Sequence, residues 1–159
     1  MEIKFRTTPT LEDAKRIRDI IESSGFFHDH EIVVAVELLI DRLEEGEHGH
    51  YQFLFAEIDG VTAGYACYGL ISCTKSSFDL YWLATHNNFR GKGIGKKILN
   101  EMYKHIKAMG GTAVYAETSE REQYLPTRKF YESCGYLKEA VLKDFYDKGD
   151  SKAVFVINV

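Results

Sequence analysis

A change in the spacing of hydrophobic residues near residue 90 constrains the fold of this chain most. Phe78–Thr85 has the composition of a strand, whereas helical spacing begins at Ile94 and is expected to end at Gly110-Gly111. The apolar side of this helix is expected to carry Ile98, Leu99, Met102, Ile106 and Met109. Between the two elements lies the glycine-rich segment Arg90–Lys97. The fold must therefore lead a strand through a tight turn into a long helix.

The rest of the chain predicts six further strands and three further helices. The strands are expected at Ile3–Arg6, Tyr51–Ile58, Val61–Ile71, Thr112–Thr118, Tyr136–Phe145 and Lys152–Asn158. The first helix is expected to be capped by Thr10 and to stop at Gly25, and its apolar face carries Leu11, Ala14, Ile17, Ile20 and Ile21. The other two helices are expected at Glu31–Glu45 and Thr127–Cys134. The order is β-α-α-β-β-β-α-β-α-β-β, with tight hairpins expected at Asp59-Gly60 and across Asp147–Asp150.

Length and composition favour one domain over residues 1–159. The chain has 159 residues, 45% of them hydrophobic, and it contains no internal repeat or low-complexity stretch. Its apolar runs are far shorter than the roughly 20 residues that cross a bilayer, and no signal peptide is expected. Three cysteines without C-x-x-C spacing favour reduced thiols. We expect a cytoplasmic protein with no membrane partner.

The charge balance and the metal-capable residues narrow the function further. A net charge of −4 argues against nucleic-acid binding, which needs a strongly basic face. The segments His28–Glu31 and His48–His50 lack the spacing of known metal sites, so no metal is expected. Cys134 has no evident histidine partner and is expected to be a buried structural thiol.

The glycine-rich segment has the features of an anion site. Backbone N–H groups at a helix start bind phosphate, and glycines allow close approach of the backbone. Arg90, Lys92, Lys96 and Lys97 add positive charge. Lys96 occupies the third glycine position of the dinucleotide fingerprint, and Arg90 and Lys97 break the P-loop pattern. Rossmann and P-loop kinase readings are therefore disfavoured.

The pattern that remains is R-x-x-G-x-G, formed by Arg90, Gly93 and Gly95. Downstream, Phe130–Tyr136 follows the pattern F-Y-x-x-x-G-[FY]. The two signatures in this order resemble the GNAT family of N-acetyltransferases over essentially the whole chain. The resemblance implies an α/β (α+β) fold: a central, mixed, mostly antiparallel twisted sheet of about seven strands flanked by about four helices.

The resemblance also implies a cosubstrate, acetyl-CoA, and a set of residues that hold it. The pyrophosphate would lie on the turn formed by Arg90, Gly91, Lys92, Gly93, Ile94, Gly95 and Lys96. Leu83 and Thr85 match the strand positions whose backbone groups contact the pantetheine arm, and the N–H near Leu83 would stabilise the oxyanion. Tyr131 matches the tyrosine that donates a proton to the sulfur of CoA.

Glu117 is the candidate general base. It follows the apolar run Val114–Ala116 and matches a glutamate of the ribosomal-protein alanine acetyltransferases; a solvated glutamate, with deprotonation through water, is the alternative. The segment Glu122–Pro126 stands where those relatives are shorter and often carry an asparagine that touches the cofactor.

The acceptor is open among polyamines, amino sugars, amino acids and protein N-termini. The resemblance places the acceptor side at the first two helices, where Phe26, Phe27 and the Glu44–His50 loop are candidates; Trp82 is expected to be half-buried. The favoured function is acetyl transfer to a primary amine of a small molecule or peptide by direct attack in a ternary complex, with a homodimer as one option for its assembly. The alternative is a CoA-binding sensor or regulatory module without turnover.

Overall fold

The computed structural model describes all 159 residues and divides them into two compact units. The first unit comprises residues 1–69 and 82–105, and the second comprises residues 70–81 and 106–159. The strand β4 (Ser77–Thr85) contributes to both, because its first five residues belong to the second unit and its last four to the first.

Seven strands and four α-helices form the chain, which confirms the predicted α/β class. The strands are β1 (Lys4–Arg6), β2 (Gln52–Ile58), β3 (Val61–Leu70), β4, β5 (Ala113–Ser119), β6 (Leu137–Asp147) and β7 (Asp150–Asn158). The helices are α1 (Asp13–Ser23), α2 (Asp29–Glu45), α3 (Ile94–Ala108) and α4 (Leu125–Ser133). The strand order is β1-β2-β3-β4-β5-β7-β6, and the β4–β5 pair is parallel in an otherwise mostly antiparallel sheet.

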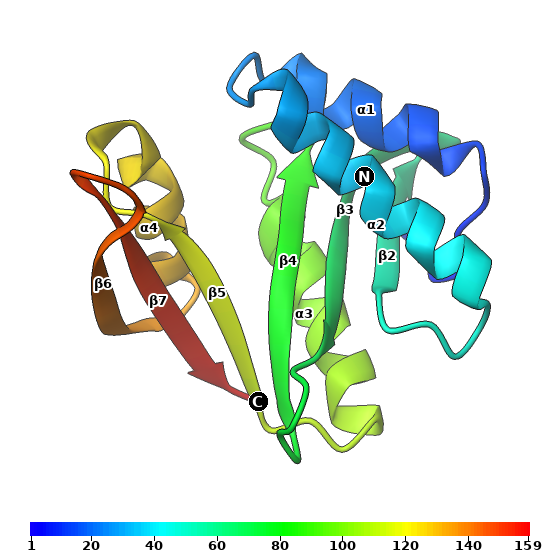
Figure 1. The fold of residues 1–159 in the computed structure, drawn as a ribbon. Helices are drawn as coiled ribbons and strands as arrows, with labels where there is room; N and C mark the ends of the chain where they lie inside the picture. Colours follow the sequence, from blue (N-terminus) through cyan, green and yellow to red (C-terminus); the bar gives the residue numbers. More distant parts are fainter. The chain divides into compact units, whose positions relative to one another are not determined.

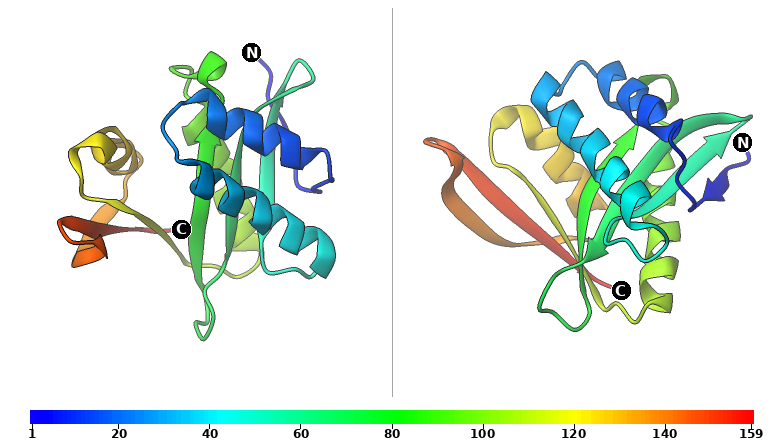
Figure 2. Two further views of the ribbon diagram at one scale, coloured as in Figure 1. Left: turned by 45° about the horizontal axis from the view of Figure 1, so that its top comes forward. Right: turned by 45° about the vertical axis from the view of Figure 1, so that its right-hand side comes forward.

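In the first unit, helices cover both faces of the strands. Figures 1 and 2 show α1 and α2 crossing one face of β2–β4, while α3 runs along the other. Fully buried rings of Phe53, Phe55 and Tyr65 stack beneath these helices with centroids 5.8 to 6.3 Å apart. The hairpin at Asp59-Gly60 is confirmed, since both residues have positive φ and Ile58 pairs with Val61.

The start of α1 differs from the prediction. Thr10 is not the N-cap: α1 begins at Asp13, whose buried carboxylate accepts a hydrogen bond from the Thr10 N–H at 2.8 Å and ion-pairs with Arg6 and Arg16. Burial alone would raise the pKa of Asp13, but hydrogen bonds from Arg6, Thr10 and Arg16 outweigh it and lower the pKa. This stabilisation is present above the unfolded pKa and is lost as the pH falls through the folded value.

Two residues expected on apolar helix faces lie in solvent. Leu11 is 68% exposed because it precedes the first turn of α1, and Met109 is 48% exposed because α3 ends at Ala108. Their spacing in the sequence continues the helical period of α1 and α3, but both residues lie just outside these helices, so their side chains do not join the buried faces. Met109 is instead part of the turn that leads to Gly110, which has a φ of +84°.

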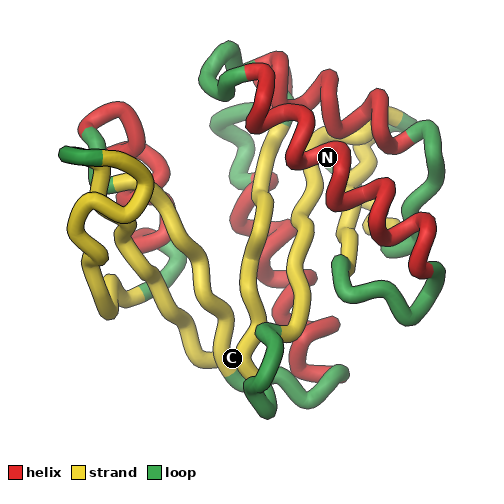
Figure 3. The backbone as a smooth tube through the Cα atoms, in the orientation of Figure 1, coloured by secondary structure: helices red, strands yellow, loops and turns green.

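In the second unit, β5, β7 and β6 form an antiparallel ladder with α4 packed against it (Figures 1 and 3). The parallel β4–β5 ladder ends at the pair Leu80–Ala116, so Glu117 is the first β5 residue beyond it. Helix α4 begins at Leu125 rather than at Thr127, because Pro126 occupies its first turn, where a missing N–H costs nothing. The hairpin loop is shorter than predicted and contains only Lys148 and Gly149.

Candidate functional site

The glycine-rich turn of the first unit adopts a backbone that favours glycine. Gly91 and Gly93 have φ values of +75° and +73°, in the left-handed region. A Cβ at either position would meet no atom within 4 Å, so the space above the turn is open. The turn therefore presents its backbone without covering side chains.

Helix α3 leaves donors unsatisfied at this turn. Its first returning hydrogen bond runs from the Lys97 N–H to the Gly93 carbonyl oxygen at 3.1 Å. The N–H groups of Gly93, Ile94, Gly95 and Lys96 precede that bond and have no helical acceptor. Such N–H groups, together with the helix dipole, favour an anion, so the turn is a candidate anion site.

The side chains of the turn reinforce this preference. Arg90, Lys92, Lys96 and Lys97 are exposed, and none of them forms an ion pair with a carboxylate. The chain as a whole has a net charge of −4, so four positive charges without a carboxylate partner make this turn locally positive. The donors, the open glycines and the charge fit the diphosphate of a CoA molecule.

Close packing fixes the end of β4, which carries Leu83 and Thr85. A Cβ on Gly64 of β3 would lie 2.8 Å from the Ala84 carbonyl oxygen and 3.0 Å from Ile98, so glycine is required there. Beyond the strand, the His86 N–H donates to the Ala63 carbonyl at 2.7 Å. The backbone that leads into the turn is thus held by β3 and α3.

In the second unit, Tyr131 lies on α4 and is only 8% exposed. Its ring centroid is 5.8 Å from that of Phe155 on β7 and 5.2 Å from that of Tyr136. Arg128 anchors the helix, since its guanidinium donates to the Ser119 carbonyl at 2.8 Å and ion-pairs with Glu120 at 3.1 Å. The ring of Tyr131 is therefore held by packing on a fixed helix.

Glu117 has a partner that the sequence reasoning missed. Its Oε2 accepts a hydrogen bond from the Lys152 Nζ at 2.9 Å, and this ammonium lies 3.6 Å from the centroid of the Phe145 ring. The Lys152 side chain is 9% exposed and that of Glu117 is 43% exposed. The sequence does contain a sign of this partner, because the charged residue Lys152 directly precedes the apolar run Ala153–Ile157.

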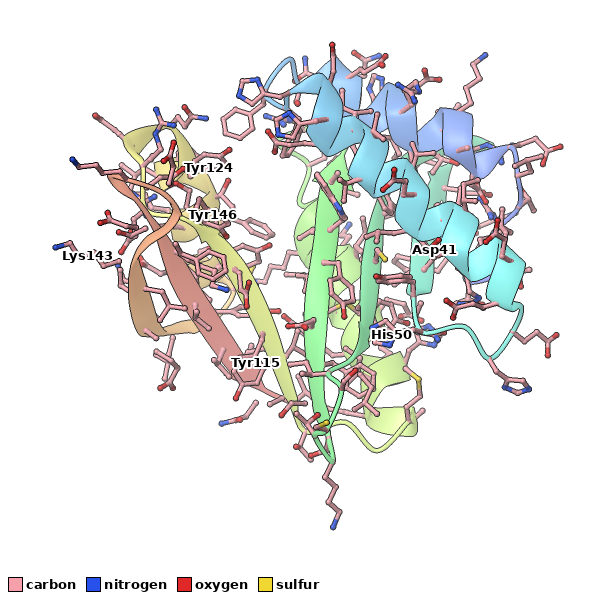
Figure 4. All side chains as sticks on the ribbon, viewed as in Figure 1. Asp41, His50, Tyr115, Tyr124, Lys143 and Tyr146 are labelled. Carbon is pink, nitrogen blue, oxygen red and sulfur yellow. The ribbon has the colours of Figure 1, made fainter.

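Tyr131 and Glu117 belong to opposite faces of the β5–β7 ladder. Tyr131 contacts Phe155, which pairs with Ala116, whereas Glu117 pairs with Val154, and neighbouring residues of a strand alternate in facing. On the Glu117 face, burial raises the pKa of Tyr146 to about 12, with Glu117, Asp150 and Tyr124 adding to the shift. Figure 4 shows Tyr146 and Tyr124 at the same end of the second unit.

Among the other candidates, the loop before α2 forms an aromatic contact. The ring centroid of Phe27 lies 5.2 Å from that of Trp82 and 5.3 Å from that of Phe26, and all three rings are half-buried. The rings of His28 and His30 stack 5.6 Å apart, and Glu31 accepts a hydrogen bond from the His28 N–H. Cys134 is half-buried rather than fully buried, because it lies at the end of α4.

Comparison with known proteins shows the family. The family model described as the acetyltransferase (GNAT) family matches residues 14–136, and this chain belongs to that family. A GNAT-family protein of known structure from Desulfovibrio desulfuricans is 40% identical, with 99% of each chain covered and a TM-score of 0.95. Among proteins with curated descriptions, none matches the chain significantly.

More distant structures share the fold. The PaiA N-acetyltransferase from Thermoplasma acidophilum, solved with coenzyme A, is 22% identical, with 100% of each chain covered and a TM-score of 0.75. A Salmonella typhimurium protein solved with acetyl-CoA is 16% identical, with 99% of this chain and 94% of that chain covered and a TM-score of 0.73. No helix of the present chain is long and apolar enough to cross a membrane.

Proposed function

We propose that this acetyltransferase moves the acetyl group of acetyl-CoA to a primary amine of a small molecule or peptide by direct attack in a ternary complex. The observation that carries the proposal is the α3 turn, where unsatisfied N–H groups, two left-handed glycines and four unpaired cations coincide. Family membership and relatives solved with CoA or acetyl-CoA support the same cosubstrate.

The residues of the chain divide the work of transfer. Arg90, Gly91, Lys92, Gly93, Ile94, Gly95 and Lys96 bind the pyrophosphate. The backbone of Leu83 and Thr85 holds the pantetheine arm, and the N–H near Leu83 stabilises the oxyanion as the carbonyl is attacked. These roles rest on the match of β4 and the turn to the family pattern.

Proton transfers complete the reaction. Glu117 accepts the proton of the substrate ammonium, directly or through a water molecule, because only the neutral amine is a nucleophile. The C–N bond then forms, the C–S bond breaks, and Tyr131 donates its proton to the leaving sulfur. The attacking nitrogen loses a second proton as the amide forms, and this proton restores the Tyr131 phenol through solvent. The net products are an amide, free CoA thiol and one proton. No step in this scheme requires a metal.

A screen for thiol release tests the proposal. Acetyl-CoA is incubated with the protein and a panel of polyamines, amino sugars, amino acids and peptides, and free CoA thiol is measured. Release that depends on one class of amine supports the proposal and identifies the acceptor. Tight binding of acetyl-CoA without release from any amine would instead support a sensor or regulatory module.

We further propose that two copies pair through β6. Every residue of β6 is exposed, including Leu137 (68%) and Phe145 (53%), and β6 is the last strand of the sheet. Long apolar edge strands are surfaces on which another chain can pair. A second copy is the partner that the charges of the strand favour.

The charges on β6 are complementary to themselves in an antiparallel arrangement. Pairing two copies about Val141 brings Lys138 opposite Asp144 and Glu139 opposite Lys143 of the other copy. Irregularities in the β6–β7 register flank Ala140–Leu142, so these central residues carry the backbone pairing, and the charged pair nearest to them, Glu139 with Lys143, acts through its side chains. The interface is then isologous, with each contact made twice.

Charge exchange tests this dimer by sedimentation over a concentration series. Glu139→Lys places two lysines opposite each other at both symmetric contacts, and we expect the dissociation constant of the dimer to increase about tenfold or more. The double variant Glu139→Lys/Lys143→Glu should restore the wild-type affinity. A monomeric wild type, or a dimer that Glu139→Lys does not weaken, would refute the interface.

A further inference from the structure

Lys152 is the unusual residue of the second unit, because it is the only lysine or arginine among the buried residues of the chain. Its ammonium has two partners, the Glu117 carboxylate at 2.9 Å and the face of the Phe145 ring. The residues that follow it on β7, Ala153 and Phe155, are fully buried and apolar. A positive charge has thus been taken out of water at one position of an apolar strand.

Stability does not explain this choice. Removing an ammonium from water costs several kcal/mol, and replacing a buried ion pair by apolar side chains of similar volume is often neutral or stabilising. Glu117 adds little in return, because its side chain is 43% exposed and water weakens its attraction to the ammonium. A methionine at position 152 would fill the same space with no charge to bury.

The effect of Lys152 is to fix the Glu117 carboxylate. A half-exposed glutamate samples several rotamers, but here Oε2 is held by an ammonium that the Phe145 ring keeps from swinging to solvent. Glu117 is also the first β5 residue beyond the ladder with β4. No hydrogen bond occupies its other oxygen, Oε1, which is therefore left to receive a proton in a fixed place.

We propose that Lys152 is a positioning residue that holds Glu117 for proton transfer from the acceptor amine, an inference that rests on the proposed function. Oε1 takes the proton from the substrate ammonium, the neutral amine attacks, and Glu117 then returns the proton to water. Lys152 itself touches neither substrate. Asp150, Tyr146 and Tyr124 are the other titratable groups on this face.

A double-mutant cycle with a stability measurement tests the proposal. Glu117→Gln, Lys152→Met, the double variant and a control, Lys104→Met, are compared with wild type by thiol release and thermal unfolding. Lys104 is the control because it also forms an ion pair with a glutamate, 2.8 Å from Glu101, and lies on α3 away from the glycine-rich turn and from β6. We measure kcat, KM for amine and acetyl-CoA, and Tm for each.

The expected pattern separates positioning from a merely structural role. Lys152→Met should lower kcat about fivefold at neutral pH, with KM for acetyl-CoA unchanged and Tm within about 2 °C of wild type. The double variant should be no slower than Glu117→Gln alone, because both changes remove the same function. Lys104→Met should leave kcat unchanged.

Each other outcome overturns the proposal in a recognisable way. If the losses in kcat of Glu117→Gln and Lys152→Met add up in the double variant, or if a fall in Tm accounts for the lost activity, Lys152 acts through the stability of the fold. A full loss in Glu117→Gln with none in Lys152→Met would overturn the positioning role and leave the function of Glu117 intact. Wild-type activity in Glu117→Gln would show that Glu117 is not the base, and Lys152 would then have no base to position. Absence of thiol release from the wild-type protein would refute the proposed transferase.

Discussion

The candidate sites of the two units rely on different chemical groups, backbone N–H groups in the first unit and side chains in the second. In the first unit, the candidate anion site consists of backbone N–H groups at the start of α3, and the side chains only add charge. In the second unit, the candidate groups are side chains, Glu117 and Tyr131, held by contacts with Lys152 and Phe155 from a distant segment. Backbone sites are encoded locally, whereas side-chain sites depend on strand pairing.

This difference predicts how each unit responds to substitution. A backbone site should be insensitive to most side-chain changes and sensitive only where a substitution changes φ. A side-chain site should lose a specific step when one functional group is removed, even if the packing is kept. The following experiments examine that contrast, from the largest expected effect to the smallest.

The largest effect is expected for Tyr131→Phe in the second unit. Removal of the phenolic proton donor should lower kcat about 10²–10⁴-fold at all working pH values, while the ring keeps its packing against Phe155. Steady-state thiol release measures the loss, and calorimetry checks that acetyl-CoA still binds. Tyr136→Phe, which changes the neighbouring ring, is the matched control. Full turnover in Tyr131→Phe would make Tyr131 a packing residue.

The next effect concerns the backbone site. Gly93→Val forces a β-branched residue to a φ of +73°, which distorts the turn and should weaken CoA binding about tenfold or more. A bulky residue at Gly95 should also weaken binding. Gly60→Val is the matched control, because Gly60 has a φ of +78° and open space in the same unit but lies in a hairpin. Equal CoA affinity in Gly93→Val and wild type would exclude the turn.

The sequence predicted the local structure of the glycine-rich turn almost completely. The residues of the turn are contiguous, the change of period marks the start of α3, and glycine identifies the positive φ values at Gly91 and Gly93. Spacing alone could not show that Gly64 must be glycine. That requirement comes from the approach of β4 and Ile98 in space.

The second unit's site was only partly predictable. Glu117 and Tyr131 were predicted as candidates because they match patterns, but Lys152 and Phe155, which contact them, lie 35 and 24 residues away along the chain. The Lys152–Glu117 bond depends on the register that pairs Glu117 with Val154, and a one-residue slip would turn Lys152 to the opposite face. Register is a property of the assembled sheet, so the sequence could mark Lys152 as unusual without naming its partner.

A smaller and pH-dependent effect is expected for Glu117→Gln. The variant should lose about tenfold in kcat/KM for the amine at neutral pH, because the ammonium then has no carboxylate to receive its proton. Activity should recover partly in alkali, where the free amine, whose pKa lies near ~10, becomes abundant. A pH–rate profile measures this. A uniform loss at all pH values would contradict a base role.

The smallest effect should be a change in amine preference at the contact between Phe27 and Trp82. These rings come from the loop before α2 and from β4, and they meet edge to face at 5.2 Å. Phe27→Ala removes the contact and should change the relative kcat/KM of two amines by a few-fold. This is less than the roughly tenfold or greater effect of a methylene group in an enclosed apolar pocket, because both rings are only half-buried. The affinity for acetyl-CoA should remain that of wild type, because the turn at Gly93 is untouched. Exchange of the whole segments Phe26–Glu31 and Glu44–His50 should enlarge the same change. An amine profile identical to wild type in all three variants would show that recognition lies elsewhere, on the side chains of the second unit.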